Sequence, residues 1–418
     1  MDITLHISEK KTSDVLVIGG GTAGVFAAIA AARAGAKTLL IEKNSVLGGT
    51  MTVANVNFPG LFFAWGEQII DGPCWESIEK TVALGGAVIP EISFKPEKHY
   101  HEQIKFNRFI YISILFEMCK EAGVEVITSA MLTALEEKTD GVSAVVTTKT
   151  GAIQIEAKSV IDATGDANAV MIAGYEVVKS AVQQPATLQN HLSGYDYEAV
   201  RREDVEKAFK TAGLPNYITL DSLMHNLLRN KFDIHTPCAD ADTSQGKTKV
   251  EQDAYELMMR LYQLCRSVPN LENLTIDFVA EETGIRETNR IVGEETITAQ
   301  DYIDGRMYDN SVCYAFYPID LHVMDGIEQQ FHKEHVVAKV PYGALIPKDA
   351  KRIFCAGRCI SSDTYANSGV RVEAVCMATG QAAGCAAAIV AKTGTSANEV
   401  PYEALCKELD ALGAIVPR

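Results

Sequence analysis

Residues 14–42 read DVLVIGGGTAGVFAAIAAARAGAKTLLIE, in which two apolar runs flank a glycine turn and an alanine-rich segment. The runs at 15–18 and 38–41 consist of valine, leucine, isoleucine and one threonine, a composition typical of parallel strands covered on both faces. The segment between them is long enough for a helix that returns the chain to the same sheet. The stretch therefore predicts a βαβ unit.

The glycine turn of this unit has the spacing GxGxxG, with glycines at Gly19, Gly21 and Gly24. The first permits a tight turn, the second lets the backbone approach a pyrophosphate, and the third lets the helix pack closely on the strand. Phosphates bound there would lie on the free amides and positive dipole of the helix start. Glu42 ends the second strand, where a carboxylate can accept hydrogen bonds from ribose hydroxyls. These residues predict a dinucleotide site.

Three further segments extend the pattern. Gly48 and Gly49 follow the acid and allow a second close backbone approach to a cofactor. VIDATGDAN, at residues 160–168, is a strand that runs into a turn, and a longer segment, RIFCAGRCISSDTYANSGVRVEAVCMATGQAAG, occupies residues 352–384. In these segments the chain resembles the flavoproteins with two dinucleotide-binding domains, and among them the FAD-dependent oxidoreductases of the FAD_oxidored type.

The resemblance covers nearly the whole chain. The recurrent stretches of this family are RETNRIVGE (286–294), YPIDLH (317–322), PYGALIP (341–347) and AGRCIS (356–361). The resemblance implies an α/β fold, with a Rossmann-like FAD-binding domain of the glutathione-reductase type and an inserted α+β substrate or cap domain. It also implies bound FAD, and it leaves the substrate open.

Changes in charge and periodicity along the chain suggest a discontinuous domain plan. We expect the FAD-binding domain to comprise residues 1–57, 103–180 and 336–418, and the substrate or cap domain to comprise 58–102 and 181–335. An amphipathic helix is expected around 250–268. The residues expected to contact FAD are Gly19, Gly21, Thr22, Ala23, Gly24, Glu42, Lys43, Gly48, Gly49, Thr50, Met131, Thr164, Gly165, Asp166, Gly357, Arg358, Gly369 and Val370.

The C-terminal segment is expected at the reactive edge of the flavin. Gly357 follows a strand, and a loop to about Gly369 precedes a helix over 370–390, whose N-terminus would stabilise negative charge on reduced flavin. Many relatives have an aspartate after the strand-end glycine, which binds a ribitol hydroxyl. This chain has Arg358, whose guanidinium could pair with the pyrophosphate, and Asp363 is a substitute for the ribitol contact.

Hydride transfer at flavin N5 requires a group that accepts or donates a proton. His322, which ends YPIDLH, is the best candidate because imidazole titrates near neutral pH; a structural histidine is the alternative. Tyr365 and Asn367 precede the expected flavin helix and could contact substrate.

Other polar residues leave two readings open. Arg286 and Arg290 could bind an anionic substrate group, but RETNR also suits an ion-pair network with Glu287. Tyr342 is expected to be structural. Cys74, in GPCW, could in principle attach the flavin covalently, although core packing is favoured.

The ten cysteines are scattered and are expected to be reduced thiols. Cys355 and Cys359 have CxxxC spacing, with His332 and His335 nearby in sequence, but zinc or iron–sulfur sites need four ligands in tight pairs, so no metal is expected. The disulfide reductases of this superfamily carry a cysteine pair after the second glycine turn, where this chain reads TMTVANVN. Thiol–disulfide chemistry is therefore not expected.

Composition narrows the partners and the location. A net charge of −16 argues against nucleic acid and anionic membrane surfaces. The opening residues MDITLHISEKK lack the apolar core of a signal peptide, and the most apolar stretch is about ten residues long, which predicts a cytoplasmic protein without a membrane span.

The expected function is hydride transfer between flavin N5 and a small polar organic molecule such as an alcohol, an amine or an activated alkene. No second nucleotide fingerprint follows residue 43, so NAD(P)H or a separate electron carrier would reach the flavin by another route. Two alternatives stay open: a non-redox flavin-dependent lyase, hydratase or isomerase, and an electron-transfer partner without its own substrate. The oligomeric state is not predicted.

Overall fold

The computed structural model describes residues 6–92, 102–324 and 326–418. Its main sheet has seven strands in the order β5-β2-β1-β8-β7-β6, with β19 also paired to β8. The parallel strands are β1 (Ile7–Ile18), β2 (Thr38–Glu42), β5 (Glu125–Thr128), β8 (Gly151–Asp162) and β19 (Ile353–Cys355). Antiparallel strands extend one edge, namely β6 (Met131–Lys138) and β7 (Gly141–Thr148).

The predicted βαβ unit is confirmed. Strands β1 and β2 pair in parallel, with Val15 opposite Thr38 and Ile18 opposite Ile41, and α1 (Thr22–Arg33) connects them. The four residues of β1 that were predicted as its strand, Val15–Ile18, are almost entirely buried. The fold is therefore mixed α/β with a sheet rich in parallel strands, as expected for a Rossmann-like FAD-binding fold.

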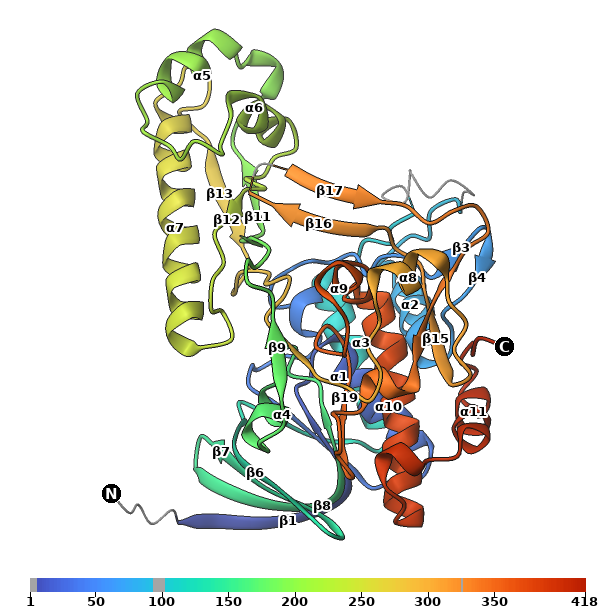
Figure 1. Ribbon diagram of the computed structural model, residues 1–418. Coiled ribbons are helices and arrows are strands. Elements are labelled where there is room, and N and C mark those ends of the chain that lie inside the picture. Colours follow the sequence, from blue (N-terminus) through green and yellow to red (C-terminus); the bar gives the residue numbers. More distant parts are fainter. Residues whose placement is uncertain (1–5, 93–101, 325) are drawn as a thin grey trace.

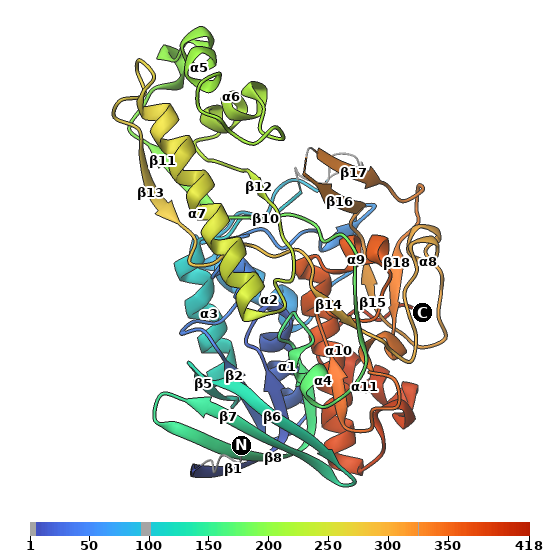
Figure 2. The ribbon, with the colours of Figure 1, turned by 60° about the vertical axis from the view of Figure 1, so that its left-hand side comes forward.

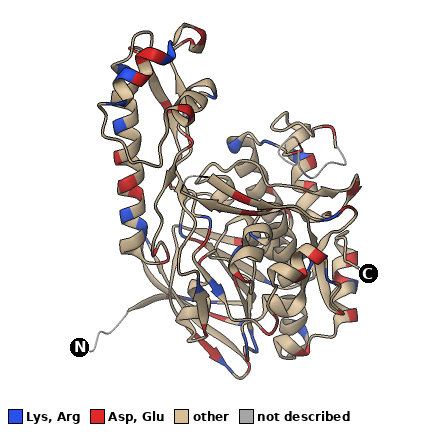
Figure 3. Cartoon of the chain, turned by 45° about the horizontal axis from the view of Figure 1, so that its top comes forward, with Lys and Arg blue, Asp and Glu red and all other residues tan. Residues whose placement is uncertain are grey.

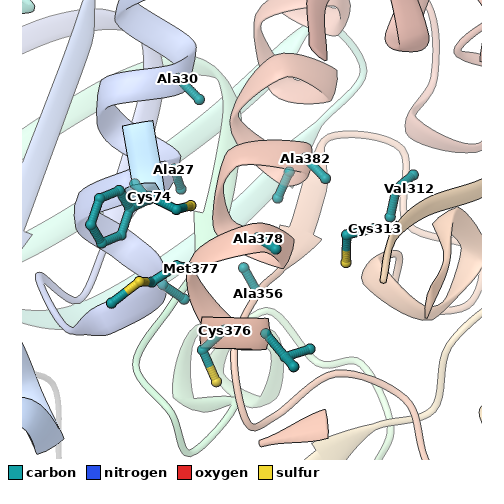
Figure 4. Packing of buried hydrophobic residues seen from close by; sticks show 14 of the residues in the cluster. Ala27, Ala30, Cys74, Val312, Cys313, Ala356, Cys376, Met377, Ala378 and Ala382 are labelled. Carbon is teal, nitrogen blue, oxygen red and sulfur yellow. The ribbon is translucent and has the colours of Figure 1, made fainter. Parts of the chain in front are cut away.

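Helix α1 packs directly on α10 (Glu373–Thr393), and small residues line the contact between the two helices (Figures 1 and 4). A Cβ atom added at Gly380 would lie 2.2 Å from the carbonyl oxygen of Ala23, and one added at Gly384 would lie 2.3 Å from that of Ala27. The two helices therefore approach so closely that only glycine fits at these positions. Helix α10 is long and apolar enough to cross a membrane by length and composition, but its apolar window is entirely buried in this core.

The same core includes segments that the domain plan assigned to the cap. Phe62, Cys74, Ile78 and Phe316 are buried in one cluster with Phe26 of α1. The elements that contribute to this part of the molecule are β3 (Phe63–Ala64), β4 (Glu67–Gln68), α2 (Pro73–Ala83), α3 (Arg108–Glu121), α8 (Ala299–Asp304), β15 (Ser311–Ala315), β18 (Ala338–Pro341) and α11 (Tyr402–Ala411). Residues 1–5 and 93–101 of the plan lie outside the described residues.

A second lobe stands apart from this body in both ribbon views (Figures 1 and 2). It has its own hydrophobic cluster, which runs from Leu188 to Ala280. Its elements are β11 (Asn190–Ser193), α5 (Arg202–Phe209), α6 (Leu220–Leu228), α7 (Ser244–Arg266) and β13 (Thr275–Val279). The expected amphipathic helix is α7, whose buried stripe includes Ala254, Leu257, Met258, Leu261, Leu264 and Cys265. Both acidic and basic residues occur along this lobe (Figure 3).

Short elements connect the lobe with the body. A hairpin of β16 (Ile319–Val323) and β17 (Gly326–Gln330) reaches from the body toward the lobe (Figure 1). The remaining short elements of the molecule, of which α4 and α9 belong to the body, are α4 (Asn168–Ile172), β9 (Val177–Lys179), β10 (Ala186–Thr187), β12 (His235–Thr236), β14 (Asn289–Ile291) and α9 (Thr364–Val370).

Candidate cofactor site and active site

A cavity of about 1560 Å³ opens at the carboxyl ends of the parallel strands. Ligands of open α/β sheets bind at this edge. Ile18, Glu42 and Ala163 line the cavity where β1, β2 and β8 end, and Thr22 and Glu373 line it at the starts of α1 and α10. The lobe and the β16–β17 hairpin supply further walls.

The glycine turn between β1 and α1 has the geometry that its spacing predicts. Gly19 has φ +100°, and a Cβ at Gly24 would lie 1.8 Å from the carbonyl oxygen of Gly19. The second glycine turn packs on the first, because a Cβ at Gly49 would lie 2.8 Å from the Cα of Gly21. In the part of the chain that the structure describes, no side chain caps the N-terminus of α1, and the first turn of α1 contains no acid. The amides there are free to bind phosphate oxygens.

Glu42 lies in the wall of the cavity and is 5% exposed. Its carboxylate accepts hydrogen bonds from the amides of Gly20 at 2.6 Å and Asn44 at 2.7 Å. Burial raises the pKa of Glu42, and the two amide hydrogen bonds oppose this shift. Each oxygen keeps a second lone pair for a ribose hydroxyl. Lys43 is half exposed and pairs instead with Glu282, 3.1 Å away.

The turn after β8 is held by a buried carboxylate. Asp162 accepts hydrogen bonds from the amide and hydroxyl of Thr164 at 2.9 and 2.7 Å and from the amide of Val170 at 3.0 Å. This fixes the predicted contact residues Thr164, Gly165 and Asp166 in the cavity wall, where Thr50 and Met131 also lie.

Arg358 does not have the free guanidinium that was expected. It donates to the carbonyl oxygen of Gly165 and to the carboxylate of Asp166, both at 2.6 Å, and to the carbonyl oxygen of Ile285. Its charge is therefore paired within the protein, although Arg358 also lines the cavity, and its contact with pyrophosphate stays a prediction. Asp363 is likewise engaged, because it caps α9 through the amide of Ala366 at 2.7 Å and accepts from the amide of Ala299 at 2.6 Å.

The segment before α10 also differs from expectation. Residues 364–370 form helix α9 rather than a loop, and α10 begins at Glu373. Gly369 packs against Tyr302, since a Cβ there would lie 2.5 Å from the Tyr302 hydroxyl oxygen, and Val370 is fully buried. Neither residue lines the cavity.

Two predicted catalytic residues on α9 are also placed away from the cavity. Tyr365 is 50% exposed, and Asn367 is fully buried and donates to the carbonyl oxygen of Arg358 at 2.9 Å. Neither is among the residues that line the cavity. Because α9 is a helix, the Tyr365 side chain faces solvent and the Asn367 side chain faces the core. In a loop, both side chains would have been free to face the flavin.

A cluster of polar side chains occupies the cavity near the start of α10. Nδ1 of His322, on β16, lies 3.1 Å from Nε2 of His235. Nε2 of His322 lies 3.0 Å from Oδ2 of Asp320. Nδ1 of His235 lies 2.8 Å from the carbonyl oxygen of Val323. Gln329, on β17, donates to Oδ1 of Asp320 at 2.7 Å. We call Asp320, His322 and His235 the relay.

Electrostatics set the resting state of the relay. Burial and the charge of Arg286 lower the pKa of His322 to about 4, although Asp320 opposes this shift. Burial would raise the pKa of Asp320, but hydrogen bonds from His322 and Gln329 bring it to about 2. Burial also lowers the pKa of His235. The histidines are therefore neutral and Asp320 is ionised near pH 7.

Sequence reasoning identified His322 but missed its partners. Asp320 and His322 are two residues apart, a spacing that places both on one face of a strand, so YPIDLH carried a signal for the pair. His235 comes from β12, and no local pattern marks it. Arg371, which precedes α10 and lines the same cavity, was also missed.

The two arginines of the RETNR segment have different surroundings. Arg290 pairs with Glu287 at 3.3 Å, and both side chains are buried; Glu287 also accepts from Ser180 and from the amide of Gln184. This is the structural network that was one of the two readings. Arg286, by contrast, lines the cavity. Tyr342 is structural as expected, and donates to the carbonyl oxygen of Ala397 at 2.7 Å.

Nine of the ten cysteines and His332 are buried, whereas Cys406 is partly exposed and His335 is exposed. Sγ of Cys355 lies 3.2 Å from Sγ of Cys359, and both residues are fully buried. His332 contacts the rings of Tyr302 and Phe316 instead. Cys74 is fully buried beside Gln381. Within residues 6–92, 102–324 and 326–418, no three His, Cys, Asp or Glu side chains form a group that could hold a metal ion.

Comparison with known proteins agrees with this geometry. The family described as FAD dependent oxidoreductase matches residues 14–409. The mitochondrial dihydrolipoyl dehydrogenase of Caenorhabditis elegans is 54% identical over 45 residues, which are 11% of this chain and 9% of that protein. Thiamine thiazole synthase from Methanococcus vannielii is 28% identical over 167 residues, which are 38% of this chain and 58% of that protein. The matches thus span less than two thirds of the length of these curated relatives.

Among solved structures, a geranylgeranyl bacteriochlorophyll reductase-like protein from Thermoplasma acidophilum aligns with a TM-score of 0.44 at 14% identity, over 96% of this chain and 83% of that one. The uncapped helix start, the two packed glycine turns and the strand-end Glu42 fit the pyrophosphate and ribose of a dinucleotide, and the family match extends over nearly the whole chain. The chain therefore belongs to the family of FAD-dependent oxidoreductases and is an enzyme that binds FAD.

Proposed function

We propose that this enzyme transfers a hydride between N5 of bound FAD and a small polar organic substrate, and that the relay Asp320–His322–His235 handles the proton. The observation that carries this proposal is the position of the relay. It lines the same cavity as the glycine turns, and Asp320 connects it to the segment before α10, because its amide donates to the Ser368 hydroxyl at 2.9 Å and its carbonyl accepts from Arg371 at 3.3 Å.

The hydrogen-bond pattern of the relay favours proton uptake. A carbonyl oxygen only accepts, so Nδ1 of His235 carries a hydrogen toward Val323, and Nε2 of the neutral ring is an acceptor. His322 then lies between two acceptors, Nε2 of His235 and the carboxylate of Asp320. A neutral His322 has one N–H and satisfies only one of these contacts. One added proton would complete the chain of hydrogen bonds. Because burial and the charge of Arg286 lower the pKa of His322 to about 4, the relay would hold that proton only transiently and pass it on.

Bound FAD supplies the hydride acceptor or donor. The residues of this chain bind the substrate, exclude water from the cavity and hold the proton. Because both ring nitrogens of His322 have neighbours, a substrate hydroxyl or amine has to displace one of them or pass its proton through Asp320. Electrons then enter or leave through the substrate, NAD(P)H or a separate electron carrier.

The test is anaerobic reduction of the purified holoenzyme, followed by flavin absorbance, with panels of alcohols, amines and hydroxy acids. We expect stoichiometric bleaching by a dehydrogenase substrate. His322→Gln should slow this reduction by about 10²- to 10⁴-fold while FAD stays bound. His335→Gln is the control, because the His335 side chain is 80% exposed, and its rate should be unchanged. An unaltered rate in His322→Gln would remove the relay from the mechanism, and turnover without net flavin reduction would favour the lyase or isomerase reading.

A further inference from the structure

Two partly buried arginines that line the cavity differ from Arg358 and Arg290 nearby. Arg358 and Arg290 each have a carboxylate partner, Asp166 at 2.6 Å and Glu287 at 3.3 Å. Within the described part of the chain, Arg286 and Arg371 have no carboxylate oxygen within 4.0 Å, although both line the cavity.

Among the described residues, the side-chain hydrogen bonds of these two arginines go to uncharged oxygens only. Arg286 donates through Nη1 to the carbonyl of Pro185 at 2.5 Å and to the hydroxyl of Thr187 at 3.1 Å. Arg371 donates through Nη2 to the side-chain oxygen of Gln184 at 3.0 Å and to the carbonyl of Asp320 at 3.3 Å. Nε of Arg371 is buried without a hydrogen-bond partner among the described residues.

The two guanidinium groups also lie close enough to repel each other. Burial and the charge of Arg371 lower the pKa of Arg286 to about 10, and burial lowers the pKa of Arg371. Four acids are near: Asp320, Asp233, Glu287 and Glu373. Glu287 already pairs with Arg290. Asp320 is engaged by His322 and Gln329, and Asp233 pairs with a lysine. Burial raises the pKa of Glu373 to about 7, so it contributes only part of a charge.

A buried cation without an anionic partner is costly, and a guanidinium binds a carboxylate with two parallel hydrogen bonds. We infer that the substrate is an organic acid whose carboxylate is bound between Arg286 and Arg371, beside the relay. This inference rests on the proposed function. Arg286 and Arg371 are thus specificity-determining residues, and they would hold the reacting carbon of the substrate near the start of α10.

Reduced flavin is a second anion that could pair with Arg286 and Arg371, because it carries negative charge near a helix start. The two anions are distinguished by the oxidised holoenzyme, in which the flavin ring is neutral. In chloride-free buffer it is titrated with malonate and benzoate, which carry no alcohol or amine to oxidise, and with malonamide and benzamide as uncharged counterparts. Flavin absorbance reports the dissociation constant without turnover, so a failure of the His322 experiment leaves this measurement intact.

We expect at least one carboxylate to bind and its amide to bind at least about tenfold more weakly, the loss for one charged hydrogen bond. Arg286→Gln and Arg371→Gln should each weaken carboxylate binding by about 10- to 100-fold, the range for a hydrogen-bonded charge. Arg306→Gln is the control, because it removes the same charge from an exposed pair with Asp301, and should leave binding within about twofold. FAD content, measured by acid release, confirms that each variant is folded.

Three results would overturn the inference. The first is that no carboxylate perturbs the oxidised flavin of the wild-type holoenzyme. The second is that amides bind as tightly as the acids. The third is that Arg371→Gln lowers the flavin reduction potential while both arginine variants keep wild-type carboxylate affinity, which would assign the guanidinium groups to reduced flavin. If one arginine variant loses FAD, the carboxylate affinity of the other arginine variant provides the test.

Discussion

The two ends of the cavity are built in different ways. The dinucleotide end consists mainly of backbone groups, namely two glycine turns in contact and free amides at the start of α1. One side-chain carboxylate completes it, and all of these groups lie within residues 18–52. The relay end consists of side chains from β12, β16 and the segment before α10, which are far apart in the sequence. A recurrent chemistry, the binding of pyrophosphate and ribose, is encoded locally. The relay, by contrast, is assembled by the tertiary fold.

The largest expected effect is at the backbone end. Gly24→Val would place side-chain atoms where the carbonyl oxygen of Gly19 lies, since even a Cβ would come within 1.8 Å. We expect a loss of about 3 kcal/mol or more in stability and no retained FAD. Thermal unfolding and acid-released FAD measure both. Gly35→Asn is the control, because this position has φ +90° and no atom within 4 Å would contact an added Cβ. Normal FAD content in Gly24→Val would contradict the close packing.

The relay end is expected to respond in rate rather than in cofactor binding. Asp320→Asn keeps the shape of the side chain but removes the charge that faces His322 at 3.0 Å. We expect flavin reduction by substrate to slow by about 10²-fold, with FAD content unchanged. Stopped-flow reduction across about pH 4 to 9, a range that includes the lowered pKa of His322, about 4, and the ordinary histidine value, is the measurement. An unchanged rate with a lowered FAD content would show that Asp320 only supports the cofactor.

Glu42 offers a smaller, equilibrium effect on the cofactor. Glu42→Ala should weaken FAD binding by about 1.5 to 3 kcal/mol, the range for a charged hydrogen-bonding group, which is about 10- to 150-fold in the dissociation constant. Fluorescence titration of apoprotein with FAD measures this. Glu125→Ala, at an exposed carboxylate on β5, is the control, and equal affinities for the two variants would show that Glu42 serves only the amides of Gly20 and Asn44.

The smallest effect is a dependence of stability on pH. Burial is the main cause that lowers the pKa of His322 and of His332 to about 4, whereas an unfolded histidine titrates near about 6.5. Between these values the unfolded chain binds more protons, so stability falls as the pH falls. From about pH 7 to about pH 5.5 each histidine should cost about 1 kcal/mol.

The variant that tests this is His332→Phe, because His332 stacks on Phe316 and a phenyl ring fits the same place. Urea unfolding at the two pH values should then show a pH dependence smaller by about 1 kcal/mol, the contribution of His332. A pH dependence identical to that of the wild type would mean that His332 is not held neutral in the folded protein.

Much of the dinucleotide end could be predicted from the sequence. The apolar runs became β1 and β2, the alanine-rich segment became α1, and the glycine spacing corresponds to real close approaches. The prediction succeeded because each of these features depends on neighbours in the sequence. Tyr365 and Asn367 were misplaced because the segment SSDTYANSG, rich in serine and with a glycine, lacks the pattern of a helix although it contributes to α9.

Arg358 shows a second limit. Its position after Gly357 suggested a phosphate partner, but the acid that it binds, Asp166, comes from the turn after β8, a strand that pairs with β19. Whether a buried arginine is paired depends on which turns a sheet brings together. The same reason explains why Arg286 and Arg371 could not be distinguished from Arg290 by sequence.

The contact between α1 and α10 also bears on how the molecule forms. These helices come from opposite ends of the chain, with residues 34–372 between them, and β19 joins the main sheet from the same late segment. Contacts of such long sequence separation form slowly, and a chain emerging from the ribosome cannot make them until residues 353–393 are free. The cofactor cavity therefore acquires one of its walls only after α10 has been synthesised, so FAD retention in a time course of translation should begin no earlier than that point.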